Sequence, residues 1–105
     1  MRKYTLYLGL NDKDSKVQQI STVEAYKIVE GLFTRNFDGA TIFEAIGIYK
    51  HDDGTVVTEN TLRIEVLEFD ISIMDKVKDV VKTLKEVFNQ ESIAVQIEVC
   101  NSELW

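Results

Sequence analysis

The spacing of the apolar residues switches along the chain between the period of a strand and the period of a helix, and this alternation restricts the possible folds. Residues 4–10 and 93–100 alternate apolar and polar side chains, as half-buried strands do. Residues 23–33 and 77–88 instead repeat apolar side chains at helical intervals. Between them, the segment 51–55 contains an Asp-Gly pair that is typical of a tight hairpin turn.

These segments, together with strand-like stretches at 40–50 and 56–69, follow the order strand, helix, strand, strand, helix, strand. This order predicts an α+β fold, the ferredoxin-like β-α-β-β-α-β sandwich, with a four-stranded antiparallel sheet and two helices on one face. Right-handed crossovers would place the first and third strands at the centre of the sheet. Because the 105 residues hold no proline, repeat or low-complexity tract, we expect a single domain over residues 1–105.

Charge and cysteine content argue against several kinds of partner and site. Lysine and arginine total 12 against 18 acidic residues, and the basic residues are scattered singly. Phosphate-binding proteins gather their cations on one face, so we expect no direct binding of nucleic acid or of a membrane. The single cysteine, Cys100, cannot form an internal disulfide or a cysteine-based zinc site. No apolar run approaches the roughly 18 residues of a membrane span, which favours a cytoplasmic setting.

If both helices cover one face of the sheet, the opposite face meets solvent or a partner. Its three aromatic side chains among small and charged residues are common at interfaces and flat ligand sites, although β-propensity alone also places aromatics on strands. The second strand contributes to this face only if Ile42, Ile46 and Ile48 point inward. That register turns Glu44 inward, which is unfavourable for an unpaired carboxylate, unless a bulge moves it out. The candidate face comprises Tyr7, Phe43, Tyr49, Glu59, Thr61 and Arg63.

The sequence offers few groups for catalysis or metal binding. His51, the only histidine, lies in the hairpin turn beside two aspartates, which together are too few ligands for a metal cage. Glu44 or Glu59 could serve as a base in an enzyme of this fold. Tyr7 or Arg63 would then hold an oxyanion, but cross-strand ion pairing explains the same residues. We therefore expect neither a metal nor a cofactor.

Several short motifs form a recognisable pattern. It comprises Phe37-Asp38-Gly39-Ala40-Thr41, Glu44-Ala45-Ile46-Gly47 and the closing Phe88-Asn89-Gln90-Glu91-Ser92-Ile93, with Tyr7 and Gly9 in the first strand. This pattern resembles that of a family of small bacterial domains of unknown function, from which no activity follows. The resemblance singles out Gln90, Glu91 and Ser92. These three either satisfy backbone groups where a helix meets the last strand, or line a site beside the sheet edge with Tyr7 and Glu59.

The absence of a catalytic motif, taken with the aromatic face, favours a non-catalytic binding or self-associating module. Its open sheet face would contact a second copy, another protein or a small ligand, and a homodimer is the simplest closed assembly. Two alternatives remain. One is a small ferredoxin-like enzyme with carboxylate and tyrosine chemistry, and the other is an acidic inhibitor or sequestering protein from a mobile element.

Overall fold

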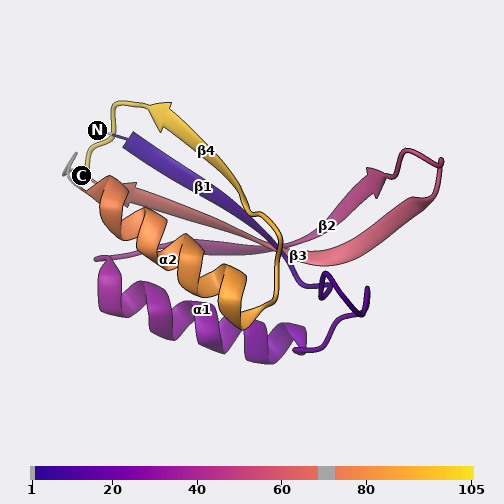
Figure 1. The fold of residues 1–105 in the computed structure, drawn as a ribbon. Coiled ribbons are helices and arrows are strands. Elements are labelled where there is room, and N and C mark those ends of the chain that lie inside the picture. Colours follow the sequence, from indigo (N-terminus) through magenta and orange to yellow (C-terminus); the bar gives the residue numbers. More distant parts are fainter. Residues whose placement is uncertain (1, 69–72) are drawn as a thin grey trace.

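The computed structural model describes residues 2–68 and 73–105. The elements along the chain are β1 (Arg2–Gly9), α1 (Thr22–Asn36), β2 (Thr41–Lys50), β3 (Val56–Glu68), α2 (Met74–Val87) and β4 (Ala94–Val99). The strands form one antiparallel sheet in the order β2-β3-β1-β4. Both helices lie on one face of this sheet (Figure 1). The ferredoxin-like α+β fold is therefore confirmed, while the predicted end of the third strand at Phe69 lies outside the described residues.

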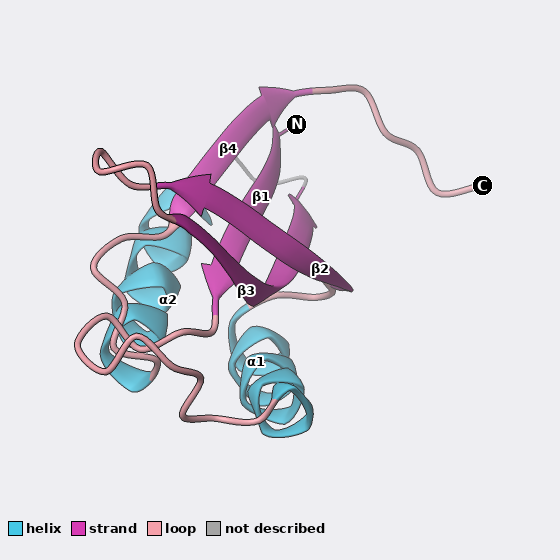
Figure 2. Cartoon of the chain, turned by 90° about the vertical axis from the view of Figure 1, so that its right-hand side faces the viewer, coloured by secondary structure: helices cyan, strands magenta, loops and turns pink. Residues whose placement is uncertain are grey.

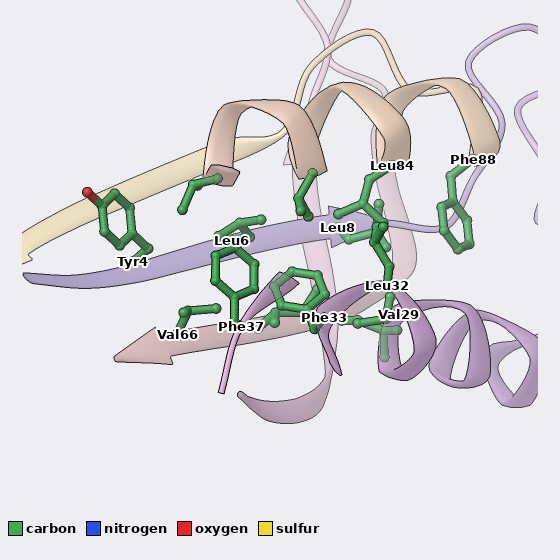
Figure 3. Packing of buried hydrophobic residues seen from close by; sticks show 14 of the residues in the cluster. Tyr4, Leu6, Leu8, Val29, Leu32, Phe33, Phe37, Val66, Leu84 and Phe88 are labelled. Carbon is green, nitrogen blue, oxygen red and sulfur yellow. The ribbon is translucent and has the colours of Figure 1, made fainter. Parts of the chain in front are cut away.

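The hydrophobic core fills the space between the sheet and the helices (Figure 3). Alternate side chains of the central strands point into it, because successive residues of a strand face opposite sides. Helix α1 begins after Ser21, whose hydroxyl accepts a hydrogen bond from the Glu24 amide at 3.2 Å and so caps the helix. Full burial of each large aliphatic side chain contributes about 1.5–3 kcal/mol. The core residues include Tyr4, Leu6, Leu8, Val29, Phe33, Leu62, Ile64, Val66, Val80 and Leu84.

Strand β2 pairs with β3 in one continuous register from Thr41 to Lys50. Glu44 lies opposite Leu62, which is fully buried on the helix side of the sheet. Glu44 itself is exposed, because β2 is an edge strand that the helices do not cover at this point. The inward register is thus compatible with a charged carboxylate, and no bulge is needed to move Glu44 into solvent.

The outer half of the β2–β3 hairpin, residues 46–60, extends beyond the two helices as an arm (Figure 1). Its tip is the predicted Asp-Gly turn, where Gly54 adopts φ of +90°, a conformation that glycine tolerates best. Because no helix covers the arm, Ile46 and Ile48 are 64% and 70% exposed although they occupy the helix side of the strand. The arm is therefore a two-stranded extension with both faces open.

The remaining segments are loops around this frame. Residues after β4 run away from the sheet, and Leu104 and Trp105 are fully exposed (Figure 2). Within residues 2–68 and 73–105, neither helix is long and apolar enough to cross a membrane.

Candidate functional site

The central part of the open sheet face is covered by its own side chains. Arg63 lies over the Phe43 ring, with 5.2 Å between the guanidinium carbon and the ring centroid, and forms an ion pair with Glu65. Tyr7 lies opposite Arg63 in the sheet and donates a hydrogen bond to Gln96 at 3.1 Å. The strand residues beneath are consequently hidden, with Thr61 only 8% exposed. We call this region the polar layer; its side chains pack against one another, although the buried Arg63 Nε has no hydrogen-bond partner among the described residues.

A hollow of about 610 Å³ opens instead where the arm leaves the sheet. This volume lies within the range of roughly 300–1,000 Å³ that is usual for small-molecule sites. Three segments far apart in the sequence form its walls: the β1–α1 loop, the arm and the α2–β4 connection. We call it the acidic hollow, and it is lined by Asn11, Asp12, Lys13, Lys16, Tyr49, His51, Asp53, Thr55, Val57, Glu59, Gln90, Glu91 and Ser92.

The acidic hollow brings together some of the residues singled out in the sequence and leaves others aside. It is lined by Tyr49 and Glu59 from the candidate sheet face. It is also lined by the three residues that the family resemblance marked, Gln90, Glu91 and Ser92. The polar layer and its surroundings hold Tyr7, Phe43, Thr61 and Arg63, while Glu44 borders a separate surface depression beside α1.

Glu59 occupies a cradle that two glycines create. A side chain on Gly9 would overlap the Glu59 Oε1 atom, so only glycine leaves room for the carboxylate there. Gly47 lies directly opposite Glu59, and a Cβ atom at that position would come within 2.9 Å of the Thr61 hydroxyl. The backbone amide of Asn11 donates to Glu59 Oε2 at 3.0 Å. This hydrogen bond holds one of the two carboxylate oxygens of Glu59, the Oε2 atom.

Aromatic side chains from the arm form a second wall. The Tyr49 and His51 rings meet edge to face, with 5.2 Å between centroids and an interplanar angle of 83°. Beside them the Thr55 amide donates to Asp53 at 2.8 Å, and this hydrogen bond lowers the pKa of Asp53. Among the described residues, no group of three or more histidine, cysteine or acidic side chains is arranged to hold a metal ion. The wall therefore offers a ring surface beside an ionised carboxylate.

The third wall is a loop tied to the end of α2. The Asn89 side chain donates to Asp12 at 2.9 Å and to Asp14 at 2.8 Å. Hydrogen bonds from the Ser15 amide and from Asn89 lower the pKa of Asp12 to about 2. Gln90 donates to the Asn11 carbonyl at 2.6 Å and to the Phe88 carbonyl at 3.2 Å. Gln90 thus satisfies backbone groups, as one interpretation of the sequence expected, and lines the hollow as well.

The loop between Asn11 and Lys16 is the part of the site that sequence reasoning did not identify. Its polar composition reads as an ordinary connection, and the contacts that place it link residues more than 70 positions apart. The one local signal was Asp12, whose carboxylate accepts hydrogen bonds from the Asp14 and Ser15 amides at 2.8 Å. Such Asx turns fix a loop without indicating what it borders.

The ionisable groups around the hollow favour a cation. The lining of the hollow includes four carboxylates, two lysines and one histidine. A concave surface with an excess of one sign of charge raises the local concentration of the opposite sign. The groups are Asp12, Asp53, Glu59, Glu91, Lys13, Lys16 and His51.

Comparison with known families and structures identifies a family and two similar folds. The model of a family described as "Protein of unknown function (DUF3574)" matches residues 3–102. The chain belongs to the DUF3574 family. The resemblance to a family of small domains of unknown function is thereby confirmed, although the match does not test the individual motifs. No curated protein sequence matches the chain at a significant level.

Two solved structures are similar to this DUF3574 domain over 92% of its length. One is a phage SAM lyase in complex with S-methyl-5'-thioadenosine, with 26% identity, a TM-score of 0.72 and 79% of that chain covered. The other is a phage SAM lyase in its apo state, with 22% identity, a TM-score of 0.65 and 78% coverage. At 22% identity, the similarity to the apo structure shows a shared fold and nothing more. Because the matched structures are those of an enzyme, the prediction of a non-catalytic module was wrong.

Proposed function

We propose that this DUF3574 domain is a lyase that cleaves S-adenosylmethionine, and that the reaction takes place in the acidic hollow. The observation that carries the proposal is the structural likeness to a phage SAM lyase at 26% identity over 92% of the chain. The volume, charge and aromatic wall of the hollow support it independently.

Charge matching is the first support from the site. S-adenosylmethionine carries a sulfonium, an ammonium and one carboxylate, so its net charge is positive. The excess of carboxylates around the hollow attracts such a molecule. Lys13 and Lys16, from the loop wall, are suited to pair with its single carboxylate. Tyr49 and His51 offer ring surface for the adenine base.

The chemistry needs little beyond correct positioning. The α-carboxylate of the substrate attacks its own Cγ atom and closes a five-membered lactone, while the bond from Cγ to sulfur breaks. The bonding electron pair stays on sulfur, which leaves as the neutral thioether S-methyl-5'-thioadenosine. No water, proton or cofactor is consumed. Holding the methionine chain in the folded conformation that brings oxygen to carbon therefore supplies the main acceleration.

Glu59 is assigned to the substrate ammonium rather than to the sulfonium. The sulfonium charge disappears as the bond to sulfur breaks, so a carboxylate placed beside it would stabilise the substrate more than the transition state. The ammonium keeps its charge throughout, and anchoring it restrains the methionine chain without that penalty. Since Asn11 occupies only one oxygen of Glu59, the other remains available for this contact. Glu91 and Ser92 are assigned to the ribose hydroxyls.

Isotope-resolved product analysis tests the proposed function. The purified chain is incubated with S-adenosylmethionine in water enriched in oxygen-18, and S-methyl-5'-thioadenosine and the four-carbon product are measured by mass spectrometry. We expect the thioether together with a lactone, or homoserine labelled only in its carboxyl group after lactone hydrolysis. Label in the side-chain hydroxyl would indicate a hydrolase, and an unsaturated amino acid would indicate elimination with Glu59 as the base. No thioether above a heat-inactivated control would refute the proposal.

Assembly and location are part of the same proposal. A homodimer remains the assembly we predict, supported by the aliphatic residues Ile46, Ile48 and Val56, which are 61–70% exposed on the arm. Light scattering at several protein concentrations tests it, and a mass of one chain throughout would exclude it.

A cytoplasmic setting fits a substrate that cells make and consume internally. The single domain over residues 1–105 also stays a prediction.

A further inference from the structure

A second hollow, of about 480 Å³, adjoins the acidic hollow and has the opposite charge. The two share Lys13 and Gln90 in their walls. We call the second one the lysine hollow. It is lined by Lys13, Lys78, Val81, Lys82, Lys85, Glu86, Asn89 and Gln90.

The lysines converge because of helix geometry and loop docking. Lys78, Lys82 and Lys85 follow one another at intervals of four and three residues in α2, so they share one face of the helix. Lys13 joins them from the β1–α1 loop, where its backbone amide donates to the Asn89 carbonyl at 3.1 Å. Between these cations the partly buried Val81 forms an aliphatic floor.

These cations are unusual in a chain with six more acidic than basic residues. In the part of the chain that the structure describes, none of the four lysines forms an ion pair. Glu86 is the one acidic residue in the lining. A lysine in the last turn complements the helix dipole, which explains Lys85 but neither Lys78, nearer the start of α2, nor Lys13.

We propose that the lysine hollow binds a small anion rich in phosphate groups, such as inorganic triphosphate or a nucleoside triphosphate. Four unpaired ammonium groups around one concave surface match several closely spaced phosphates. From Lys78 to Lys85 the helix rises about 10 Å, which suits two or three linked phosphates better than a nucleic-acid strand. The net charge of −6 on the whole chain also opposes a long polyanion, whereas a compact ligand meets mainly the local field.

Calorimetric titration of the full chain with inorganic triphosphate at low salt tests this site. The test variant is Lys82→Glu combined with Lys85→Glu. The matched control is Lys50→Glu combined with Lys76→Glu, which changes the net charge equally at exposed lysines that line neither hollow. Circular dichroism of each variant verifies that the fold is retained. Amide chemical shifts of Lys13, Asn89 and Gln90 in the unmodified chain provide a second reading that needs no substitution.

We expect saturable binding of one triphosphate per chain, weakened roughly tenfold or more in the test variant and by less than about twofold in the control. The amide shifts should saturate at the same ligand concentration. Absence of saturable binding, or equal weakening in both variants, would overturn the proposal. A short DNA duplex that displaces triphosphate at lower concentration would overturn it in favour of nucleic-acid binding. Because the titration omits S-adenosylmethionine, the result stands apart from that of the proposed lyase reaction.

Discussion

The polar layer and the acidic hollow lie on the same face of one sheet, yet only the hollow has room for a ligand. In the polar layer, long side chains cover one another, as Arg63 does with Phe43 on the neighbouring strand and with Glu65 on its own strand. In the acidic hollow, Gly9 and Gly47 instead leave room on the strands for the Glu59 side chain, which lines the cavity. On this face, glycines rather than clustered aromatics mark the place where a carboxylate can lie close to the strands beside a cavity.

The two regions also differ in what holds them. The polar layer rests on a regular ladder of strand pairs, whereas the hollow depends on a loop and an arm that extend beyond the core. Hydrogen bonds from Asn89 to Asp12 and from Gln90 to Asn11 supply the rigidity that packing supplies elsewhere. A site built in this way can change its lining without disturbing the hydrophobic core.

The largest expected effect is a difference in kcat/KM between variants of two glutamates on the same face of the sheet, Glu59 and Glu65. Glu59→Gln should lower kcat/KM for S-adenosylmethionine about 100-fold, because a hydrogen bond between two opposite charges is replaced by a weaker one in which only the substrate ammonium is charged. Thioether formation measured at several substrate concentrations gives the value. Glu65→Gln is the matched control from the polar layer, where the carboxylate pairs with Arg63 and Lys3. Equal losses in the two variants would mean that the acidic hollow has no special role.

A smaller loss is expected when the cradle of Glu59 is filled. Gly9→Ala places a methyl group against the end of a flexible side chain, so the fold should persist while the carboxylate moves. We expect kcat/KM to fall roughly tenfold, since small displacements of positioning groups slow catalysis strongly. Gly39→Ala is the control, because a Cβ atom there would meet nothing within 4 Å. Full activity of Gly9→Ala would show that the position of Glu59 is unimportant.

The order of strands and helices could be predicted from the sequence better than the acidic hollow could, because the two depend on different kinds of signal. Alternating and helical apolar patterns, with the Asp-Gly turn, are local signals and were sufficient for the order of elements. Glu59 could be placed on the open face by strand alternation alone, whereas Tyr49 could be placed there only once the register of the second strand was known. Their meeting with Gln90 and the Asn11 loop depends on long-range hydrogen bonds and on how far the arm extends, which no local pattern encodes.

The wrong prediction of a non-catalytic role has a related cause. Searching for a nucleophile beside a base assumes that the protein supplies the reacting groups. In the proposed reaction the substrate supplies its own nucleophile and its own leaving group, and the protein contributes shape and charge. Residues such as Glu59 and Lys16 then resemble ordinary surface residues in the sequence.

The loop wall is expected to show a pH-dependent contribution to stability. The folded-state pKa of Asp12 is lowered from 3.8 to about 2, so its ionised form stabilises the native state above roughly pH 4. This contribution is lost as the pH falls through about 2. In urea unfolding, the unmodified chain should be modestly more stable than Asp12→Ala at pH 7, and the difference should shrink between pH 4 and pH 2. A difference that is constant over this range would show that charge on Asp12 does not hold the loop.

The smallest effect is expected from the polar layer itself. Phe43→Leu keeps an apolar side chain but removes the ring beneath Arg63, so the loss should be limited to a cation–π contact of about 0.5–1 kcal/mol. Urea unfolding measures this loss, and kcat/KM should stay within about twofold because Phe43 does not line the hollow. A fall in kcat/KM comparable to that of Glu59→Gln would extend the site across the sheet. The contrast between a closed central face and an open end would then no longer hold.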